Sequence, residues 1–254
     1  MRMANLKLSA QLYTVRDAAQ KDMPALLKAV RAIGFTGVEL AGFGSLKTAA
    51  EVRQALDDSG LRVSGAHVPL ESLETDFVNA VRDQKTIGNI EVVIPYLGES
   101  RRQTKADWLG HAASFNSIGR KLADEGMRLS YHNHDFEFQQ FGGQTAMDLL
   151  LQHVDPALMA YEVDVYWVAQ AGLDPLTFLR GLGSRLRILH CKDRAPDGRF
   201  AAVGTGTLDF PALTRAATDA GVEWGVVEQD DCYGQDPLAV LKTGYDNLKK
   251  LGHA

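Results

Sequence analysis

Cysteine is scarce in this chain of 254 residues, which contains only Cys191 and Cys232. Two cysteines do not make the disulfide framework of a small secreted protein, so we expect a reducing compartment and a cytoplasmic location. Long apolar runs are missing too, since no stretch approaches the roughly 20 residues of a membrane-spanning helix. The N-terminal residues also lack the apolar core of a signal peptide. We therefore expect no membrane partner.

The sequence also has no cluster of positively charged residues. The chain carries 27 Lys and Arg against 32 Asp and Glu, which gives a net charge of −5. A protein that binds nucleic acid usually presents a basic stripe to the phosphates, and this sequence has none. The charge pattern therefore predicts no nucleic-acid partner. It favours a small-molecule substrate without an obligatory phosphate, and it leaves a homo-oligomer open.

Linkers are absent as well, because no Pro-, Gly- or Ser-rich segment divides the sequence. Short apolar runs alternate instead with amphipathic stretches, the pattern of repeated βα units. The expected strands lie at residues 6–15, 37–43, 61–68, 90–97, 127–134, 158–165, 186–193 and 222–229. Expected helices lie at residues 25–35, 49–60, 121–127 and 213–222, each with a glycine near its end. Eight units in about 250 residues predict one domain over residues 1–254, a (β/α)8 TIM barrel.

An open, doubly wound α/β sheet is the alternative architecture. Its dinucleotide-binding form places a G-x-G-x-x-G turn after the first strand, and this chain has no such turn there. The glycines of GTG, Gly204 and Gly206, are expected to form a loop rather than a phosphate cradle. The barrel therefore remains the preferred prediction.

Four polar residues stand where four of the expected strands stop. His132 ends LSYH, Asp164 ends AYEVD, His190 ends RILH and Glu228 ends GVVE. Their separations of 32, 26 and 38 residues each fit about one strand and one helix, so the four belong to successive βα units. A closed barrel gathers such positions at its catalytic mouth. Two imidazoles and two carboxylates that meet there predict a site for one divalent metal ion.

The chemistry of this set narrows the choice of metal. Imidazole and carboxylate ligands without thiolate suit Mn, Co, Zn or Fe(II) better than Ca, and we favour Mn. Structural roles stay open, since Asp164 could cap the next helix and Glu228 could pair with a lysine. Glu162 shares the face of Asp164 one layer deeper, where a carboxylate needs a cation partner. Cys191 faces the other way and is expected to pack in the core.

Other polar residues end the remaining strands at the same expected mouth. Glu39, His67 and Tyr96 follow the second, third and fourth strands and are candidates for binding substrate hydroxyls. Lys192, two residues after His190, could neutralise an oxyanion or pair with its neighbour Asp193.

An ordered series of short motifs runs along nearly the whole chain. It comprises AQLYTVRD from Ala10, GFTGVELAGF from Gly34, AHVPLESL from Ala66, YHNHDFEF from Tyr131, EVDVYWVAQAG from Glu162, LHCKD from Leu189, VGTGTLDFPAL from Val203 and VVEQDD from Val226. In this order the series resembles the xylose isomerase-like TIM-barrel superfamily of sugar isomerases and epimerases. The resemblance implies metal ligands Glu, Asp, His and Glu at the ends of strands five to eight. These positions fall on His132, Asp164, His190 and Glu228.

The first ligand position departs from the pattern of the relatives, many of which have Glu-Asn where this chain has His132 and Asn133. Glu137, at the end of the same motif, is the substitute ligand. In the epimerase relatives, two metal-bound glutamates face opposite sides of the sugar carbon. This chain keeps Glu228, our preferred catalytic base. His132, His134 or Glu137 would then have to serve the opposite face.

The resemblance implies a metal-dependent sugar isomerase or epimerase that removes a proton next to the carbonyl of a keto-sugar or related polyol. Trp167 stands where relatives have a histidine, and it would offer an apolar wall or stacking surface to a sugar ring. The departures also fit a lyase or dehydratase that acts on a 3-keto-glycoside or an inosose. An alternative of another class is a non-catalytic sugar-binding barrel, which would need no metal.

Overall fold

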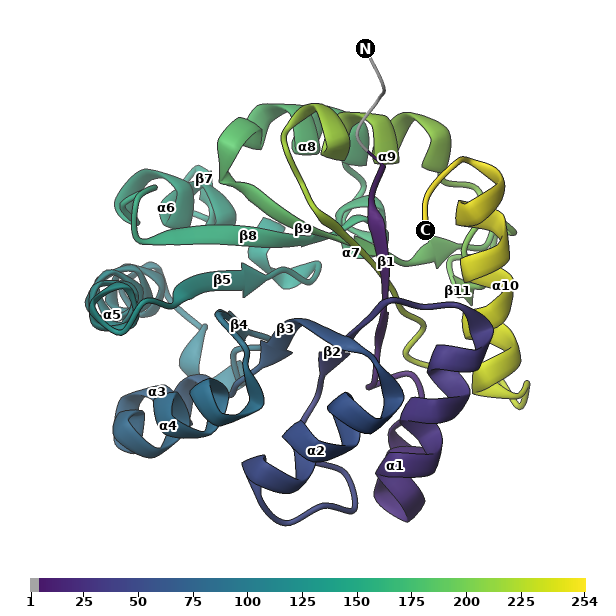
Figure 1. The fold of residues 1–254 in the computed structure, drawn as a ribbon. Helices are drawn as coiled ribbons and strands as arrows, with labels where there is room; N and C mark the ends of the chain where they lie inside the picture. The colour runs from purple at the N-terminus through teal and green to yellow at the C-terminus, as the bar shows by residue number, and fades with distance from the viewer. Residues whose placement is uncertain (1–4) are drawn as a thin grey trace.

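A closed barrel of eight parallel strands, ringed by helices, forms the core of the computed structural model, which describes residues 5–254 (Figure 1). The barrel strands are β1 (Lys7–Gln11), β2 (Gly37–Leu40), β3 (Arg62–His67), β4 (Glu91–Ile94), β5 (Arg128–His132), β8 (Met159–Asp164), β9 (Leu186–Cys191) and β12 (Trp224–Val227). Each lies within a strand that the alternation of apolar runs predicted. The (β/α)8 barrel is therefore confirmed, and the open sheet is wrong.

Helices connect the strands on the outside of the barrel. They are α1 (Arg16–Ile33), α2 (Ala49–Ser59), α3 (Leu70–Thr75), α4 (Phe77–Ile87), α5 (Lys105–Asp124), α6 (Ala146–His153), α7 (Val165–Gln170), α8 (Pro175–Leu182), α9 (Phe210–Asp219) and α10 (Pro237–Lys250), with 3-10 turns η1 (Glu99–Arg101), η2 (Phe136–Phe138) and η3 (Gly183–Arg185). Local signals fix their ends. Thr48 caps α2 in a capping box with Glu51, and Gly60 ends the same helix in the left-handed region at φ 68°.

Two short hairpins were not expected from the sequence. One pairs β6 (Gln140–Phe141) with β7 (Gln144–Thr145), and the other pairs β10 (Asp193–Arg194) with β11 (Phe200–Ala201). They follow the barrel strands β5 and β9, at the carboxyl ends where a TIM barrel carries its active site. The second hairpin thus lies directly after His190 and Lys192.

The order of strands around the ring is β1-β12-β9-β8-β5-β4-β3-β2, so the last strand pairs with the first. Lys7 lies opposite Trp224 in that closing pair. The chain ends reinforce it, because the backbone N–H of Leu6 donates to His253 Nδ1 at 3.2 Å and that of Ala254 donates to the Leu6 carbonyl at 3.2 Å. Figure 1 shows α10 beside α1, which completes the outer ring.

The barrel interior changes from apolar to polar along the strands. A small apolar cluster of Val93, Ile188, Trp224 and Val226 comes from β4, β9 and β12. Two residues further along β9, His190 belongs to a polar layer that is wholly buried. Gly65 on β3 makes room there, because a Cβ atom at this position would lie 2.7 Å from Glu39 Oε1. The polar layer places charged groups directly beneath the mouth.

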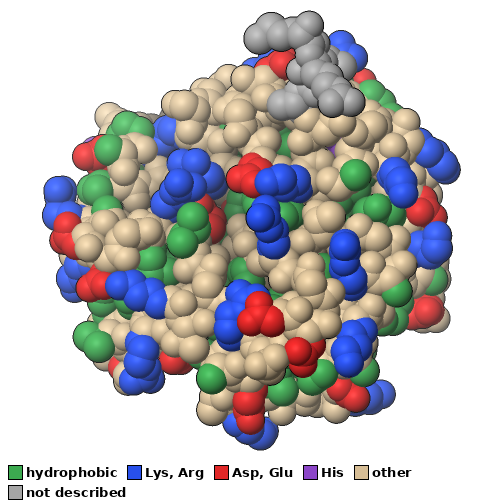
Figure 2. Space-filling view, viewed as in Figure 1, with side chains coloured by type: hydrophobic (Ala, Val, Ile, Leu, Met, Phe, Trp, Pro, Cys, Tyr) green, Lys and Arg blue, Asp and Glu red, His purple; other side chains and the backbone are tan. Residues whose placement is uncertain are grey.

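Two features of the described residues concern the hydropathy of the helices and the charge of the surface. Within the described residues, no helix is long and apolar enough to cross a bilayer. Figure 2 shows acidic and basic side chains interspersed over the face in view, without a continuous basic stripe on that face.

Glu91 of β4 is a buried carboxylate below the polar layer, 5% exposed. Its Oε1 accepts a hydrogen bond from Ser130 Oγ at 2.5 Å, and Arg187 Nε lies 4.0 Å from its Oε2. Burial raises the pKa of Glu91 from 4.5 by more than the Ser130 bond and Arg187 lower it. The folded state therefore holds this proton to a higher pH than the unfolded chain does.

Glu91→Gln should make the protein more stable at neutral pH, because the amide removes a charge that burial disfavours. Because the pKa of Glu91 is higher in the folded state, the parent loses free energy of unfolding as pH rises from 4.5 through the folded-state pKa. The glutamine variant has no such loss, so its advantage over the parent should grow across that pH window. Urea unfolding of parent and variant at pH 4.5 and pH 7.5 measures the difference. An equal difference at both pH values would contradict this assignment.

Candidate functional site

The structure brings together the four residues that end successive strands. One ligand atom from each of His132, Asp164, His190 and Glu228 lies within 4.8 Å of the others, and all four residues are buried. They come from β5, β8, β9 and the residue after β12. Closure of the barrel produces this convergence, since the positions are far apart in sequence.

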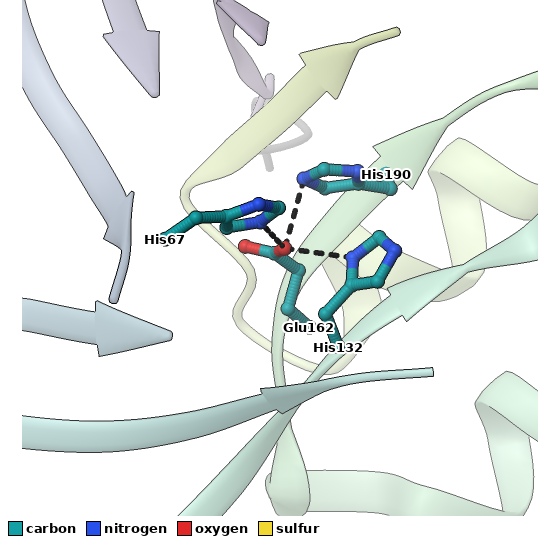
Figure 3. Close-up of side chains that lie close together, drawn as sticks. All are labelled: His67, His132, Glu162 and His190. Carbon is teal, nitrogen blue, oxygen red and sulfur yellow. Dashed lines mark hydrogen bonds and ion pairs between the residues drawn. The ribbon is translucent and has the colours of Figure 1, made fainter. Parts of the chain in front are cut away.

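A second group lies on the inner side of the same histidines. Three imidazoles surround one oxygen, Glu162 Oε1, as Figure 3 shows. The distances to it are 2.8 Å from His67 Nε2, 2.9 Å from His132 Nδ1 and 3.0 Å from His190 Nε2. The buried Glu162 therefore has its partners, and the strand alternation that placed it one layer below Asp164 is confirmed.

The outer nitrogens of the two shared histidines face carboxylates. His132 Nε2 lies 3.8 Å from Asp164 Oδ2, and His190 Nδ1 lies 3.1 Å from Glu228 Oε2. Two nitrogens and two carboxylate oxygens thus meet in a buried space, a donor set that suits a divalent transition metal. The outer group fits such an ion by its chemistry and by its spacing.

Asp164 has a structural role as well. It is the N-cap of α7, where its Oδ1 accepts from the backbone N–H groups of Tyr166 at 2.9 Å and Trp167 at 3.3 Å. Its Oδ2 is directed instead toward His132 and Lys192. The cap holds the carboxylate in place, so the two roles support each other.

Lys192 places a positive charge inside the site. Its ammonium is 1% exposed and lies 2.9 Å from Asp164 Oδ2, 2.9 Å from Glu228 Oε2 and 2.8 Å from Asp230 Oδ1. Burial opposes the charged form, but these carboxylates outweigh it and hold the pKa of Lys192 well above its ordinary value. In turn Lys192 and then His190 outweigh burial and keep the pKa of Glu228 well below 4.5. Both groups are charged at neutral pH.

His190 connects the two groups. Burial lowers the pKa of His190, but the carboxylates of Glu162 and Glu39 raise it well above 6.5. Its Nε2 lies 2.6 Å from Glu39 Oε2 as well as 3.0 Å from Glu162 Oε1. One ring therefore contacts carboxylates on both of its sides.

A cavity of about 540 Å³ opens over this site. It is lined by Tyr13, Ala41, Gly42, His67, Pro69, Pro95, Tyr96, His132, His134, Lys192, Glu228 and Asp230. The lining is aromatic and apolar at the rim and charged at the floor. Tyr13 and Tyr96, which are 44% and 48% exposed, form the rim. Such a combination suits a small polyhydroxylated molecule.

His134 is a neutral base candidate in this wall. Burial, and then the neighbouring His132, lower the pKa of His134 well below 6.5. Its ring stacks on Phe136 with centroids 5.2 Å apart and an interplanar angle of 8°. The ring of Trp167 also packs against it, with centroids 5.2 Å apart. Aromatic contacts thus hold the imidazole at the cavity.

Three of the five residues expected to bind substrate line the cavity: His67, Tyr96 and Lys192. Glu39 does not, because it is fully buried in the polar layer, where Gln11 Nε2 donates to its Oε2 at 2.7 Å. Burial, and then the charge of Glu162, raise the pKa of Glu39 to about 8. Trp167 is not among the lining residues either, but its ring packs against His134 and lies 5.6 Å from Lys192 Nζ, and both of those residues line the cavity. The expected contact of Glu39 with substrate is therefore corrected, whereas that of Trp167 stays a prediction.

Glu137 does not join the cluster. It is fully buried, where the Tyr131 hydroxyl donates to its Oε1 at 2.5 Å and the His134 backbone N–H donates to its Oε2 at 2.7 Å. The 3-10 turn η2 carries it back against strand β5. The expectations that Glu137 is a substitute ligand or a catalytic base are corrected, and His132 is the strand-five residue among the candidate ligands.

The loop after β9 determines what the carboxylate of Asp193 contacts. Its Oδ2 accepts from the backbone N–H groups of Gly204 at 2.9 Å and Gly206 at 2.8 Å, and its Oδ1 accepts from Arg194 and Leu208. GTG is thus a loop, as expected, and it wraps this carboxylate. The alternative in which Lys192 pairs with Asp193 is wrong.

Asp230 was not foreseen from the sequence. It lines the cavity and contacts Lys192, and burial followed by the charge of Glu228 raises its pKa to about 6. The run of acidic residues after VVE was a weak signal, because loop residues do not follow strand periodicity.

Comparisons with known proteins agree with this fold. The profile of the family described as xylose isomerase-like TIM barrel matches residues 27–251. An inosose dehydratase of Clostridium botulinum is 25% identical over 246 residues, which cover 80% of this chain and 79% of that protein. A sugar phosphate isomerase/epimerase structure from Parabacteroides distasonis has a TM-score of 0.85 at 23% identity, covering 96% and 94% of the two chains. An L-ribulose 3-epimerase structure has a TM-score of 0.74 at 16% identity, covering 98% and 96%.

Asp193→Ala should loosen the loop that carries Gly204 and Gly206, because four backbone N–H groups lose their acceptor. We expect a loss of roughly 3 kcal/mol in the free energy of unfolding, the size of a buried, charge-assisted network. Chemical denaturation measures it. Asp197→Ala, at the exposed tip of the same hairpin, is the control and should change stability by less than about 0.5 kcal/mol. Equal losses in both variants would contradict the prediction.

Proposed function

The chain belongs to the xylose isomerase-like TIM barrel family, and we propose that it is a metal-dependent lyase that removes water from a keto-polyol. The curated relatives named inosose dehydratase support this reaction class and a cyclic polyol ketone as the substrate class. The cavity supports an uncharged substrate, since Lys192, its one Lys or Arg lining residue among those described, is engaged by three carboxylates.

The asymmetry of the mouth is the observation that carries the proposal. Glu228 and Lys192 come from the ends of β12 and β9, whereas His67 and Tyr96 come from β3 and β4 on the opposite arc of the ring. One side thus offers a carboxylate and an ammonium, and the other side offers imidazole and phenol. An elimination needs one base close to a group that supports the departing oxygen, and the first side provides both.

Four residues would hold the metal: His132, Asp164, His190 and Glu228. A divalent ion bound there would supply a Lewis acid that stabilises negative charge on a substrate oxygen. The fit rests on the convergence of two outward-facing nitrogens and two carboxylate oxygens within 4.8 Å.

The chain's own residues would move the proton. Glu228, ionised at neutral pH, takes the proton from the carbon next to the carbonyl. Lys192 offers positive charge to the oxygen on which negative charge develops. The hydroxyl on the next carbon then leaves with the proton that Glu228 has collected, so a carbon–carbon double bond and water form. Glu228 returns to its ionised state.

Isomerisation or epimerisation is the second candidate, and His134 favours it. Its neutral imidazole lines the same cavity and follows β5, away from Glu228 on the ring. Were His134 to return a proton to the opposite face of the carbon, the product would be an epimer and no water would be lost. Incubation of the metal-loaded protein with inososes and 3-keto-glycosides in D2O separates the reactions. Loss of water supports the lyase, whereas deuterated epimer supports the epimerase. A protein that binds these compounds without exchange or product is the non-catalytic barrel.

Asp164→Ala and His190→Ala should each abolish retention of a divalent ion and activity together, because each removes one of four ligands. Metal content after gel filtration, measured by mass spectrometry, checks this. Tyr96→Phe, at the rim of the cavity, is the control and should retain the ion as the parent does. If either ligand variant keeps parental metal content, the ligand set is wrong.

Glu228→Gln keeps the size of the side chain but removes the base. We expect turnover to fall roughly 10²–10⁴-fold, the usual size of a general-base contribution. Solvent deuterium exchange at the substrate carbon should fall with it, as measured by NMR on metal-loaded protein. Exchange at the parental rate would move the base to His134.

A further inference from the structure

We propose that Glu162 is the positioning residue that sets which nitrogen of each metal-ligand histidine carries its proton, and that it does so through one oxygen atom. The inference rests on the proposed metal site. It adds a contact on the inner side of the ligand histidines, the carboxylate of Glu162, which we call the anchor. Glu162 does not line the cavity, and the role proposed for it is to orient the ligand histidines rather than to bind the ion.

The geometry of the inner group gives the first step. His132 reaches Glu162 Oε1 through Nδ1 at 2.9 Å, and His190 reaches the same oxygen through Nε2 at 3.0 Å. The two rings therefore present different nitrogens to one acceptor (Figure 3). A proton on each inward nitrogen leaves Nε2 of His132 and Nδ1 of His190 as the lone pairs that face Asp164 and Glu228.

The chemistry of metal-bound imidazole gives the second step. A histidine that ligates through one nitrogen usually donates its other N–H to a carboxylate or carbonyl, which fixes the ring and raises its basicity. Here Glu162 contacts both ligand histidines, while His190 Nε2 also lies 2.6 Å from Glu39 Oε2. The two rings are coupled through Glu162, because its displacement would remove an acceptor from both at once.

Because Glu162 is buried, its contacts with the three imidazoles are needed to stabilise its charge. Glu162 is fully buried, and burial alone opposes its charge. Its other oxygen, Oε2, has no hydrogen-bond partner among the described residues. An arrangement that leaves one buried carboxylate oxygen without a donor costs free energy. Convergence of all three imidazoles on Oε1 offsets that cost and concentrates the donors at one point.

His67 extends the anchor to the cavity wall. Its Nε2 lies 2.8 Å from Glu162 Oε1, and its ring stacks on His190 with centroids 5.8 Å apart and an interplanar angle of 14°. His67 also lines the cavity. The wall that faces substrate and the rings that face the metal therefore share one acceptor.

Glu162→Gln tests the anchor without substrate. The amide keeps the shape but loses the charge, so we expect Mn2+ to bind 10- to 100-fold more weakly in calorimetric titration. Glu91→Gln is the matched control, because it makes the same substitution at another buried barrel carboxylate, one that contacts Ser130 rather than a ligand. Its Mn2+ affinity should equal that of the parent.

Proton positions give a readout that a merely structural role would not move. In Zn2+-loaded parent protein, long-range ¹H–¹⁵N spectra should show the remaining proton on Nδ1 of His132 and on Nε2 of His190. Protons on the opposite nitrogens would overturn the inference even if Glu162→Gln failed to fold.

The outcomes separate the two proposals. A parent that binds no Mn2+ overturns the metal site and the anchor together. A parent that binds Mn2+ while Glu162→Gln binds it equally well overturns the anchor alone. Weaker binding in Glu162→Gln, with Glu91→Gln unchanged, supports the anchor.

Discussion

Compensation of buried negative charge is the constraint on which the rest of this structure depends. Three carboxylates, those of Glu162, Asp164 and Glu228, are at most 4% exposed inside or at the mouth of the barrel. Uncompensated charges in such a place would destabilise the fold by several kcal/mol each. The ammonium of Lys192, the imidazoles and the proposed divalent ion supply the positive charge. Because each partner contacts several carboxylates, the polar layer behaves as one network rather than as separate pairs.

This network also sets the chemical character of the mouth. Lys192 and Glu228 hold each other ionised, while burial keeps His134 neutral. Charged and neutral proton-handling groups are thus separated on different strands of one ring. Under the proposed function this separation favours loss of a leaving group, since matching groups on both sides would favour return of the proton.

Periodicity accounts for what the sequence predicted well. The eight strands and the convergence of His132, Asp164, His190 and Glu228 follow from residues that end successive apolar runs, because strand ends meet in a closed barrel. How far below the mouth of the barrel a side chain lies was harder to predict. Glu39 lies below the mouth, on a four-residue strand whose pairing with β3 shifts register between Val38 and Glu39, and such a shift leaves no mark in one sequence.

The contacts made by loop residues could not be predicted from the sequence either. Glu137, Asp193 and Asp230 all follow strands, but a 3-10 turn, a glycine loop and a lysine contact decide where their carboxylates point. These are tertiary interactions between segments without a regular repeat. Residue type therefore predicted the four donors that meet at the strand ends, whereas the positions of these loop carboxylates required the backbone path.

The pairing of β1 with β12 has a consequence for how the barrel closes. It places Lys7 opposite Trp224, so β1 must wait for β12, which is synthesised much later, before the ring can close. Glu228 directly follows β12. Until β12 has docked, the proposed ion site would lack Glu228, and β1 would present an open sheet edge.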